Sequence, residues 1–167
     1  EVSAPCVIDA DGLNALTIEH ISGRPGDVPL VLTPHPGEMS RLTGRGVTEI
    51  LDSREQVARG LASECRATVV LKGAPTVTAD PAGELWVNPT GNCGMASGGT
   101  GDVLTGVIAS LLGQGKSATD AAVLGSYVHG YAGDLAAEAL GQRGMTAGDV
   151  MDYLPLALVE IEASGTT

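Results

Sequence analysis

The sequence contains no phenylalanine, and its aromatic residues are one tryptophan and three tyrosines in a chain of 167 residues. A core must therefore be built from Leu, Val and Ile, together with small residues that let backbones approach closely. The 24 glycines fit that interpretation. With 43% hydrophobic and 17% charged residues, the composition is that of a globular protein rather than a disordered one. The length is typical of one domain.

Basic residues are scarce. The chain has two lysines, Lys72 and Lys116, and its formal net charge is −11. This charge argues against binding to nucleic acid or to an anionic membrane, because both are bound chiefly through Lys and Arg. A phosphate-containing ligand would need local compensation from backbone N–H groups, a helix terminus or a metal ion.

Cysteines and long apolar runs are also few. Three scattered cysteines with no C-x-x-C pair do not form a disulfide framework, and they favour a reducing compartment. The apolar runs fall well short of the roughly 18 residues that a membrane span needs. The first residues show no signal-peptide pattern. We therefore expect a cytoplasmic protein.

Apolar segments alternate between strand and helix patterns. The pattern predicts strands at 6–8, 28–32 and 68–71, and a hairpin formed by 76–78 and 84–87. Helices are expected at 14–20, 38–42, 53–66, 103–112, 118–140 and 147–163. This order favours an α/β layered domain with a mainly parallel sheet. The loops 9–11, 33–38 and 72–73 follow strands, so we expect them to share the ligand-binding edge of the sheet.

The glycine-rich stretch at 98–102 is the strongest local signal for chemistry. Glycines before a helix let successive N–H groups point at an anion, and the helix dipole adds positive potential there. Asp102 would either complement that dipole or accept a proton from a hydroxyl group. The stretch is neither a P-loop nor a dinucleotide-binding fingerprint.

Other polar residues at strand ends leave two interpretations open. Lys72 would hold nucleotide phosphates as a point charge, or it is an ordinary solvated lysine. His35, between two prolines, is a structural or a functional loop residue. Asp9 and Asp11 are metal or hydroxyl ligands, or turn formers.

Four segments together resemble one family. The stretches 9–14 (DADGLN), 33–39 (TPHPGEM), 71–76 (LKGAPT) and 88–106 (NPTGNCGMASGGTGDVLTG) occur in the same order as motifs of the ADP- or ATP-dependent NAD(P)H-hydrate dehydratases. That family is also found as the carboxy-terminal half of bifunctional epimerase–dehydratase proteins. One departure is Cys93, which stands where the family usually has proline.

The resemblance implies a single ribokinase-like α/β domain over residues 1–167, with a mainly parallel sheet flanked by helices and the amino-terminal part of the family's domain missing. It implies that ATP or ADP phosphorylates the hydroxyl of NAD(P)H hydrate, after which phosphate is eliminated and NAD(P)H is restored. Nucleotide use in turn implies Mg²⁺. The partners implied are the hydrate and an adenine nucleotide, a second copy of the chain in a homo-oligomer, and an epimerase domain or the missing amino-terminal segment.

Specific roles follow from the same resemblance. Asp102 would be the catalytic base and a hydrate contact, and His35 would be a second hydrate contact. The nucleotide would be held by Lys72, Gly73, Ala74, Pro75, Thr76 and Gly101. Two alternatives stay open: a ribokinase-like kinase of a small molecule, such as a hydroxyethylthiazole kinase, and a non-catalytic fragment or assembly module.

Overall fold

The computed structural model describes residues 4–24 and 28–165 and contains one five-stranded sheet. Its strands, in spatial order, are β1 (Cys6–Ile8), β2 (Leu30–Leu32), β3 (Thr68–Leu71), β4 (Val77–Ala79) and β5 (Leu85–Val87). The pairings β1–β2 and β2–β3 are parallel, whereas β3–β4 and β4–β5 are antiparallel. The fold is α/β as expected, but the sheet is mixed, because short connections join β3, β4 and β5 and short connections allow only antiparallel pairing.

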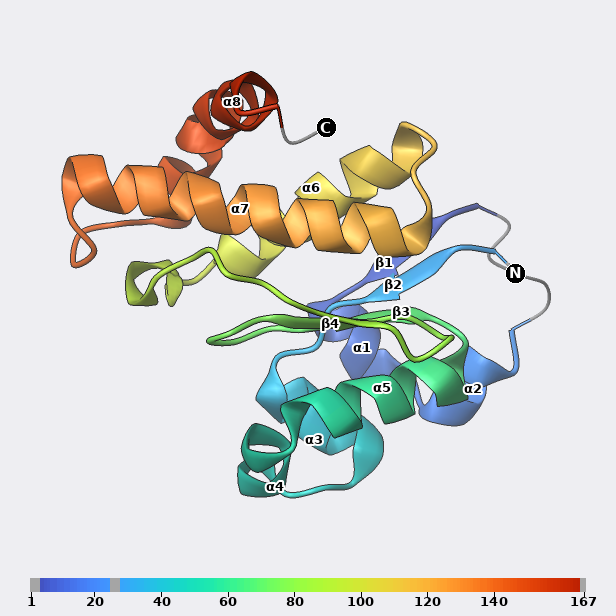
Figure 1. Cartoon of the computed structure of the whole chain (residues 1–167). Coiled ribbons are helices and arrows are strands. Elements are labelled where there is room, and N and C mark those ends of the chain that lie inside the picture. Colours follow the sequence, from blue (N-terminus) through green and yellow to red (C-terminus); the bar gives the residue numbers. More distant parts are fainter. Residues whose placement is uncertain (1–3, 25–27, 166–167) are drawn as a thin grey trace.

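Helices cover both faces of the sheet, as Figure 1 shows. One face carries α1 (Ala10–Ala15), α2 (Ile18–Ser22), α3 (Pro36–Thr43), α4 (Val47–Asp52) and α5 (Arg54–Cys65). The other carries α6 (Thr100–Gly113) and α7 (Ala118–Leu140), with α8 (Ala147–Ala163) outside them against α7. A short 3-10 helix, η1 (Cys93–Met95), precedes α6.

The strands place alternate side chains in two cores. Val31 and Val70 pack with α6 and α7, whereas Leu32 and Val69 pack with the helices on the opposite face. All four side chains are fully buried. This is the period-2 alternation of a strand with both faces covered, and it explains why these strands read as continuous apolar runs.

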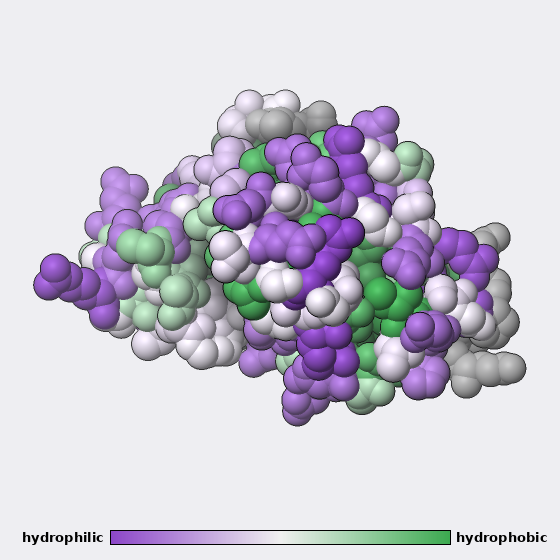
Figure 2. All heavy atoms as spheres, turned by 90° about the horizontal axis from the view of Figure 1, so that it is seen from below, coloured by the Kyte–Doolittle hydropathy of each residue, from purple (hydrophilic) through white to green (hydrophobic). Residues whose placement is uncertain are grey.

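The outer surface of the α1–α5 layer is largely hydrophilic, with smaller hydrophobic areas between the polar side chains, as seen from that side in Figure 2. Its helices therefore turn their apolar sides toward the sheet. No helix within residues 4–24 and 28–165 is long and apolar enough to cross a membrane.

The structure corrects several expected helices. The single helix expected at 14–20 is two helices, because the Thr17 hydroxyl accepts the His20 N–H and starts α2 with a capping box. Helix α6 begins at Thr100 rather than at 103, after Gly99 in a left-handed conformation (φ 89°). Ser53, at the start of the helix expected at 53–66, precedes α5 as its N-cap, but its side chain makes no cap hydrogen bond. The sequence did not predict helix α4. Helices α7 and α8 have the expected bounds.

Helix α7 holds the segment that follows β5. Side-chain groups of this 88–95 segment donate to helix carbonyl oxygens, from Asn88 to Ser126 at 3.1 Å, from Thr90 to Tyr127 at 3.0 Å and from Asn92 to Gly133 at 3.0 Å. The Asp134 carboxylate also accepts the Gly91 N–H at 2.8 Å. The conformation of the segment is therefore set by the helix together with hydrogen bonds inside the segment, between Asn88 and Thr90 and from the Gly94 N–H to Asn92.

Gly130 allows this close contact. A Cβ atom built at Gly130 would lie 2.2 Å from Thr90 Oγ1 and 2.8 Å from the Thr90 carbonyl carbon. Only a residue without a side chain fits there, which explains a glycine in the middle of a long helix.

A buried histidine joins α7 to α6. His129 is 8% exposed, and its Nε2 lies 3.0 Å from the Thr100 carbonyl oxygen. Because a carbonyl oxygen only accepts, Nε2 carries the proton of a neutral ring. Burial lowers the pKa of His129 from its ordinary 6.5 to about 4, although the hydrogen bond to Thr100 partly opposes the shift.

Replacement of Gly130 by alanine should destabilise the protein by about 1–3 kcal/mol, because the added methyl group has to displace the Thr90 backbone. Gly60→Ala in α5 is the matched control, since a Cβ there has no neighbour within 4 Å. The control should be neutral or more stable by about 0.5–1 kcal/mol. Urea unfolding measures both, and equal effects of the two substitutions would contradict the packing described.

Stability should fall in mild acid because of His129. Between the ordinary pKa of 6.5 and the folded-state value of about 4, the unfolded chain binds a proton that the native chain does not. The free energy of unfolding therefore decreases as pH falls through this window, by up to about 3 kcal/mol. In urea unfolding at about pH 7 and about pH 5, His129→Gln should lose less stability than the wild type. If His129→Gln loses as much unfolding free energy between the two pH values as the wild type, His129 does not cause the loss.

Candidate functional site

A pocket of about 900 Å³ opens at the carboxyl ends of β1, β2 and β3. Its lining comes from residues 9–10, 35–38 and 72–76, from parts of 88–104, and from α7 near Gly130. The three strand-end loops expected to share one face do so. Small-molecule pockets commonly enclose about 300–1,000 Å³, so this one has room for a ligand at the upper end of that range.

Lys72 lies at the centre of a hydrogen-bonded network between strand ends. Its Nζ is 2.6 Å from Asp9 Oδ1 and 3.8 Å from Glu38 Oε2. The Thr105 hydroxyl of α6 donates to the other Asp9 oxygen at 2.7 Å. The network ties the ends of β1 and β3 to α6.

The environment of Asp9 keeps its carboxyl group ionised. Burial alone would raise its pKa, but hydrogen bonds from Lys72 and Thr105 and the Lys72 charge outweigh burial, so the pKa of Asp9 is lowered. Each carboxylate oxygen accepts one hydrogen bond, so Asp9 is a structural partner of Lys72 and Thr105. Asp11 lies in the first turn of α1, is exposed and does not line the pocket.

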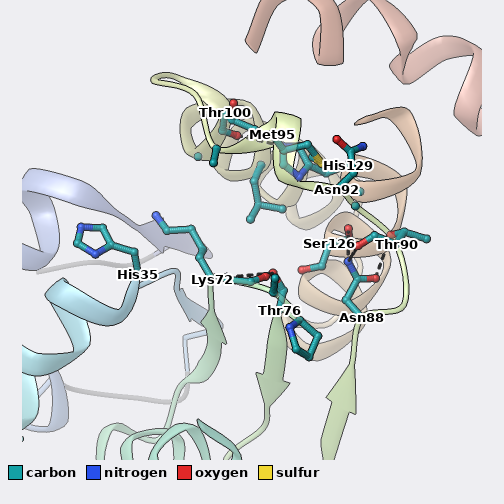
Figure 3. A pocket seen from close by; sticks show the side chains of 18 of the residues that line it. His35, Lys72, Thr76, Asn88, Thr90, Asn92, Met95, Thr100, Ser126 and His129 are labelled. Carbon is teal, nitrogen blue, oxygen red and sulfur yellow. Dashed lines mark hydrogen bonds between the residues drawn. The ribbon is translucent and has the colours of Figure 1, made fainter. Parts of the chain in front are cut away.

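The loop at 72–76 is a tight turn against the pocket. The Lys72 N–H donates to the Pro34 carbonyl oxygen at 2.9 Å, and the Thr76 hydroxyl donates to the Gly73 carbonyl oxygen at 3.1 Å. Gly73 has a φ of 150°, a value that L-residues with side chains rarely adopt. In Figure 3, Lys72 and Thr76 extend from neighbouring strand ends toward the same space.

His35 has the structural role that the sequence left open, as a helix cap. It is the N-cap of α3, and its Nδ1 accepts the N–H groups of Gly37 at 3.0 Å and Glu38 at 3.3 Å. The Glu38 carboxylate accepts the His35 N–H at 2.7 Å in return, which completes a capping box. The side chain of His35 is 54% exposed and lines the pocket, so one ring both caps a helix and faces the site.

The start of α6 presents unpartnered donors beside a free carboxylate. Within the described parts of the chain, the N–H groups of Gly101 and Asp102 have no acceptor. The Asp102 side chain is exposed in the pocket lining and has no hydrogen bond or ion pair there. A Cβ at Gly101 would lie 3.4 Å from Lys72 Nζ, so this helix terminus directly adjoins the lysine. The arrangement suits an anion held between the amides and Lys72.

All the residues to which the resemblance assigns a role line this pocket, but the lining itself does not test what each one binds. They are His35, Lys72, Gly73, Ala74, Pro75, Thr76, Gly101 and Asp102. The described segments hold no group of three or more Asp, Glu, His or Cys side chains placed to bind a metal ion.

Sequence reasoning missed the far wall of the pocket. Asn88, Ser126 and His129 line it opposite His35 and Lys72, as Figure 3 shows. Ser126 is 3% exposed and its hydroxyl has no partner within the described residues. The available signal was the row of small residues at Ser126, Gly130 and Gly133, which marks one face of α7 as a close-contact surface.

Comparisons with known proteins agree with the resemblance drawn from the motifs. The family model for NAD(P)H-hydrate dehydratase matches residues 1–156. The bifunctional NAD(P)H-hydrate repair enzyme Nnr of Moorella thermoacetica is 53% identical over 163 residues, which cover 96% of this chain and 30% of that protein.

Solved structures show the same relationship. The ADP/ATP-dependent NAD(P)H-hydrate dehydratase of Bacillus subtilis, co-crystallised with ATP and Mg²⁺, is 36% identical with a TM-score of 0.85, covering 93% of this chain and 55% of that one. Ribokinase of Thermotoga maritima is 19% identical with a TM-score of 0.58, covering 93% of this chain and 50% of that one, which shows a shared ribokinase-like fold alone. The chain thus spans only part of each of these proteins, but its family is plain: it belongs to the NAD(P)H-hydrate dehydratases.

Proposed function

We propose that the protein uses ADP or ATP to dehydrate (S)-NAD(P)H hydrate, restoring NAD(P)H with release of phosphate and AMP or ADP. The observation that carries the proposal is the start of α6. There a free carboxylate, Asp102, stands beside two unpartnered amides and next to Lys72, inside a pocket of about 900 Å³.

The chemistry requires a hydroxyl group to attack a phosphoryl group, and each part of the site has a task in it. Asp102 accepts the hydroxyl proton as the hydroxyl oxygen bonds to the terminal phosphorus of the nucleotide. The bridging P–O bond breaks and AMP or ADP leaves. The N–H groups of Gly101 and Asp102 stabilise the charge on the transferring group, which is where most catalysis of phosphoryl transfer arises.

The second step removes the new phosphate ester. The carbon–oxygen bond breaks, and the departing phosphate takes a proton from the adjacent ring carbon, so the double bond of the dihydronicotinamide forms again. His35 contacts the hydrate, since its ring faces the pocket while its Nδ1 is held by α3. The 72–76 loop holds the nucleotide, with Lys72 directed at the phosphates.

The lining fits a magnesium ion that arrives with the nucleotide. Mg²⁺ usually keeps several waters and takes only one or two protein carboxylates in addition to phosphate oxygens. Two largely buried carboxylates in the lining, Asp9 and Glu38, would hold the ion through the acceptor sites that their hydrogen bonds to Lys72, Thr105 and the His35 N–H leave free. When bound, the ion neutralises phosphate charge during transfer.

Asp102→Asn should reduce kcat by about 10²–10⁴-fold, because the amide cannot accept the hydroxyl proton. Binding of ADP or ATP should be nearly unchanged, since the backbone amides remain. The assay mixes hydrated NADH with the protein, Mg²⁺ and nucleotide, and follows the recovery of the reduced nicotinamide absorbance.

Asp120→Asn is the matched control, because Asp120 occupies the same third position of helix α7 but is exposed outside the pocket. It should keep wild-type kcat. If Asp102→Asn turns over as fast as this control, Asp102 is not the base. If the wild type consumes nucleotide and yields a stable phosphorylated product without NADH, the protein is a kinase instead.

A further inference from the structure

Arg54 lies beneath the 72–76 loop, on the side away from the pocket. Its Nη2 donates to two loop carbonyl oxygens, at 3.1 Å to Lys72 and 2.8 Å to Pro75, and to that of Leu71 at the end of β3 at 3.1 Å. Arg54 does not line the pocket. It therefore contacts the backbone that carries the pocket residues without reaching the pocket itself.

The guanidinium group fills the concave side of the loop. A Cβ built at Gly73 would lie 2.6 Å from Arg54 Nη2, so the arginine occupies the space that a side chain at this position would take. Arg54 Nε is buried and has no partner within the described residues. Leaving a polar atom unpartnered costs stability, so Arg54 makes its Nη2 contacts to the backbone at the expense of Nε.

The position of Arg54 is also unfavourable for its own helix. It is the first residue of α5, where the helix dipole disfavours a cation, and Ser53 provides no side-chain cap. A residue type that destabilises its own helix, such as this arginine at the first position of α5, is expected at functional positions.

Arg54 supplies a positive charge that no carboxylate of the described residues balances, unlike the charge of Lys72. Lys72 is paired with Asp9 at 2.6 Å and faces Glu38 at 3.8 Å, so nearby carboxylates balance its charge. In residues 4–24 and 28–165, no carboxylate lies within ion-pair distance of Arg54. Burial lowers the pKa of the guanidinium, which nevertheless stays charged at neutral pH. The loop therefore rests on a positive charge that no acidic side chain neutralises.

We propose that Arg54 is a positioning residue for the nucleotide: it ties the 72–76 loop to the end of β3 through the carbonyl groups of Lys72, Pro75 and Leu71, and it provides positive potential for the phosphates. The inference rests on the proposed function, in which this loop holds ADP or ATP. It predicts that Arg54 governs nucleotide affinity and leaves affinity for the hydrate unchanged.

The test compares Arg54→Met and Arg54→Lys with Arg59→Met, the matched control. Arg59 is on the same helix, is exposed and does not line the pocket. Isothermal titration measures the Kd for ADP and for ATP with Mg²⁺, and the nicotinamide assay gives KM for each substrate. Arg54→Met should weaken nucleotide binding about tenfold or more, with KM for the hydrate unchanged.

Arg54→Lys distinguishes the effect of the hydrogen bonds from that of the positive charge, because lysine keeps the charge but cannot bond to all three carbonyl groups. It should bind nucleotide with intermediate affinity, and it serves as the test if Arg54→Met does not fold. Arg59→Met should match the wild type.

Wild-type nucleotide affinity in folded Arg54→Met or Arg54→Lys would overturn the inference, as would an equal rise in KM for both substrates. A wild type that binds nucleotide without restoring NADH would overturn the proposed reaction only, since the role of Arg54 is measured by binding. A wild type that binds no adenine nucleotide would overturn both.

Discussion

The ion pair between Lys72 and Asp9 is the interaction on which the site depends. The two residues follow β3 and β1, and both side chains are largely buried. A buried pair is costly to desolvate, and the cost is offset only when further hydrogen bonds satisfy the charged groups. Thr105 supplies such a bond, so the pair also anchors α6 beside the strand ends. The helix terminus with Gly101 and Asp102 is thereby brought against Lys72.

Helix α7 is the second element that holds the start of α6 in place, after the ion pair between Lys72 and Asp9. It carries the 88–95 segment on its own carbonyl groups and joins the start of α6 through His129. Gly130 makes that approach possible. The two supports meet at the first turn of α6, so the proposed catalytic residue is held from the sheet side and from the helix side. A chain with a net charge of −11 can hold phosphate there because unpartnered amides and a few placed cations supply the attraction.

The sequence predicted the strands, the two long helices and the strand-end positions of His35 and Lys72 because each follows a local rule, whereas the other residues of the near wall came from the family resemblance. Apolar runs mark buried strands, and polar residues directly after them mark the ligand-binding edge. What it could not predict depends on contacts between distant segments. His129 against Thr100 and Arg54 beneath the 72–76 loop are such contacts. The His35 cap is local, but histidine is not among the residues preferred at the N-cap position. The break at Thr17 did have a local signature, a capping box, and was missed.

The most direct test of the account is a crystal structure of the protein with ADP and Mg²⁺. The account predicts the terminal phosphate at the N-terminus of α6, within hydrogen-bond distance of the N–H groups of Gly101 and Asp102, with the 72–76 loop against the nucleotide. A nucleotide bound elsewhere, or one whose phosphates point away from α6, would contradict it.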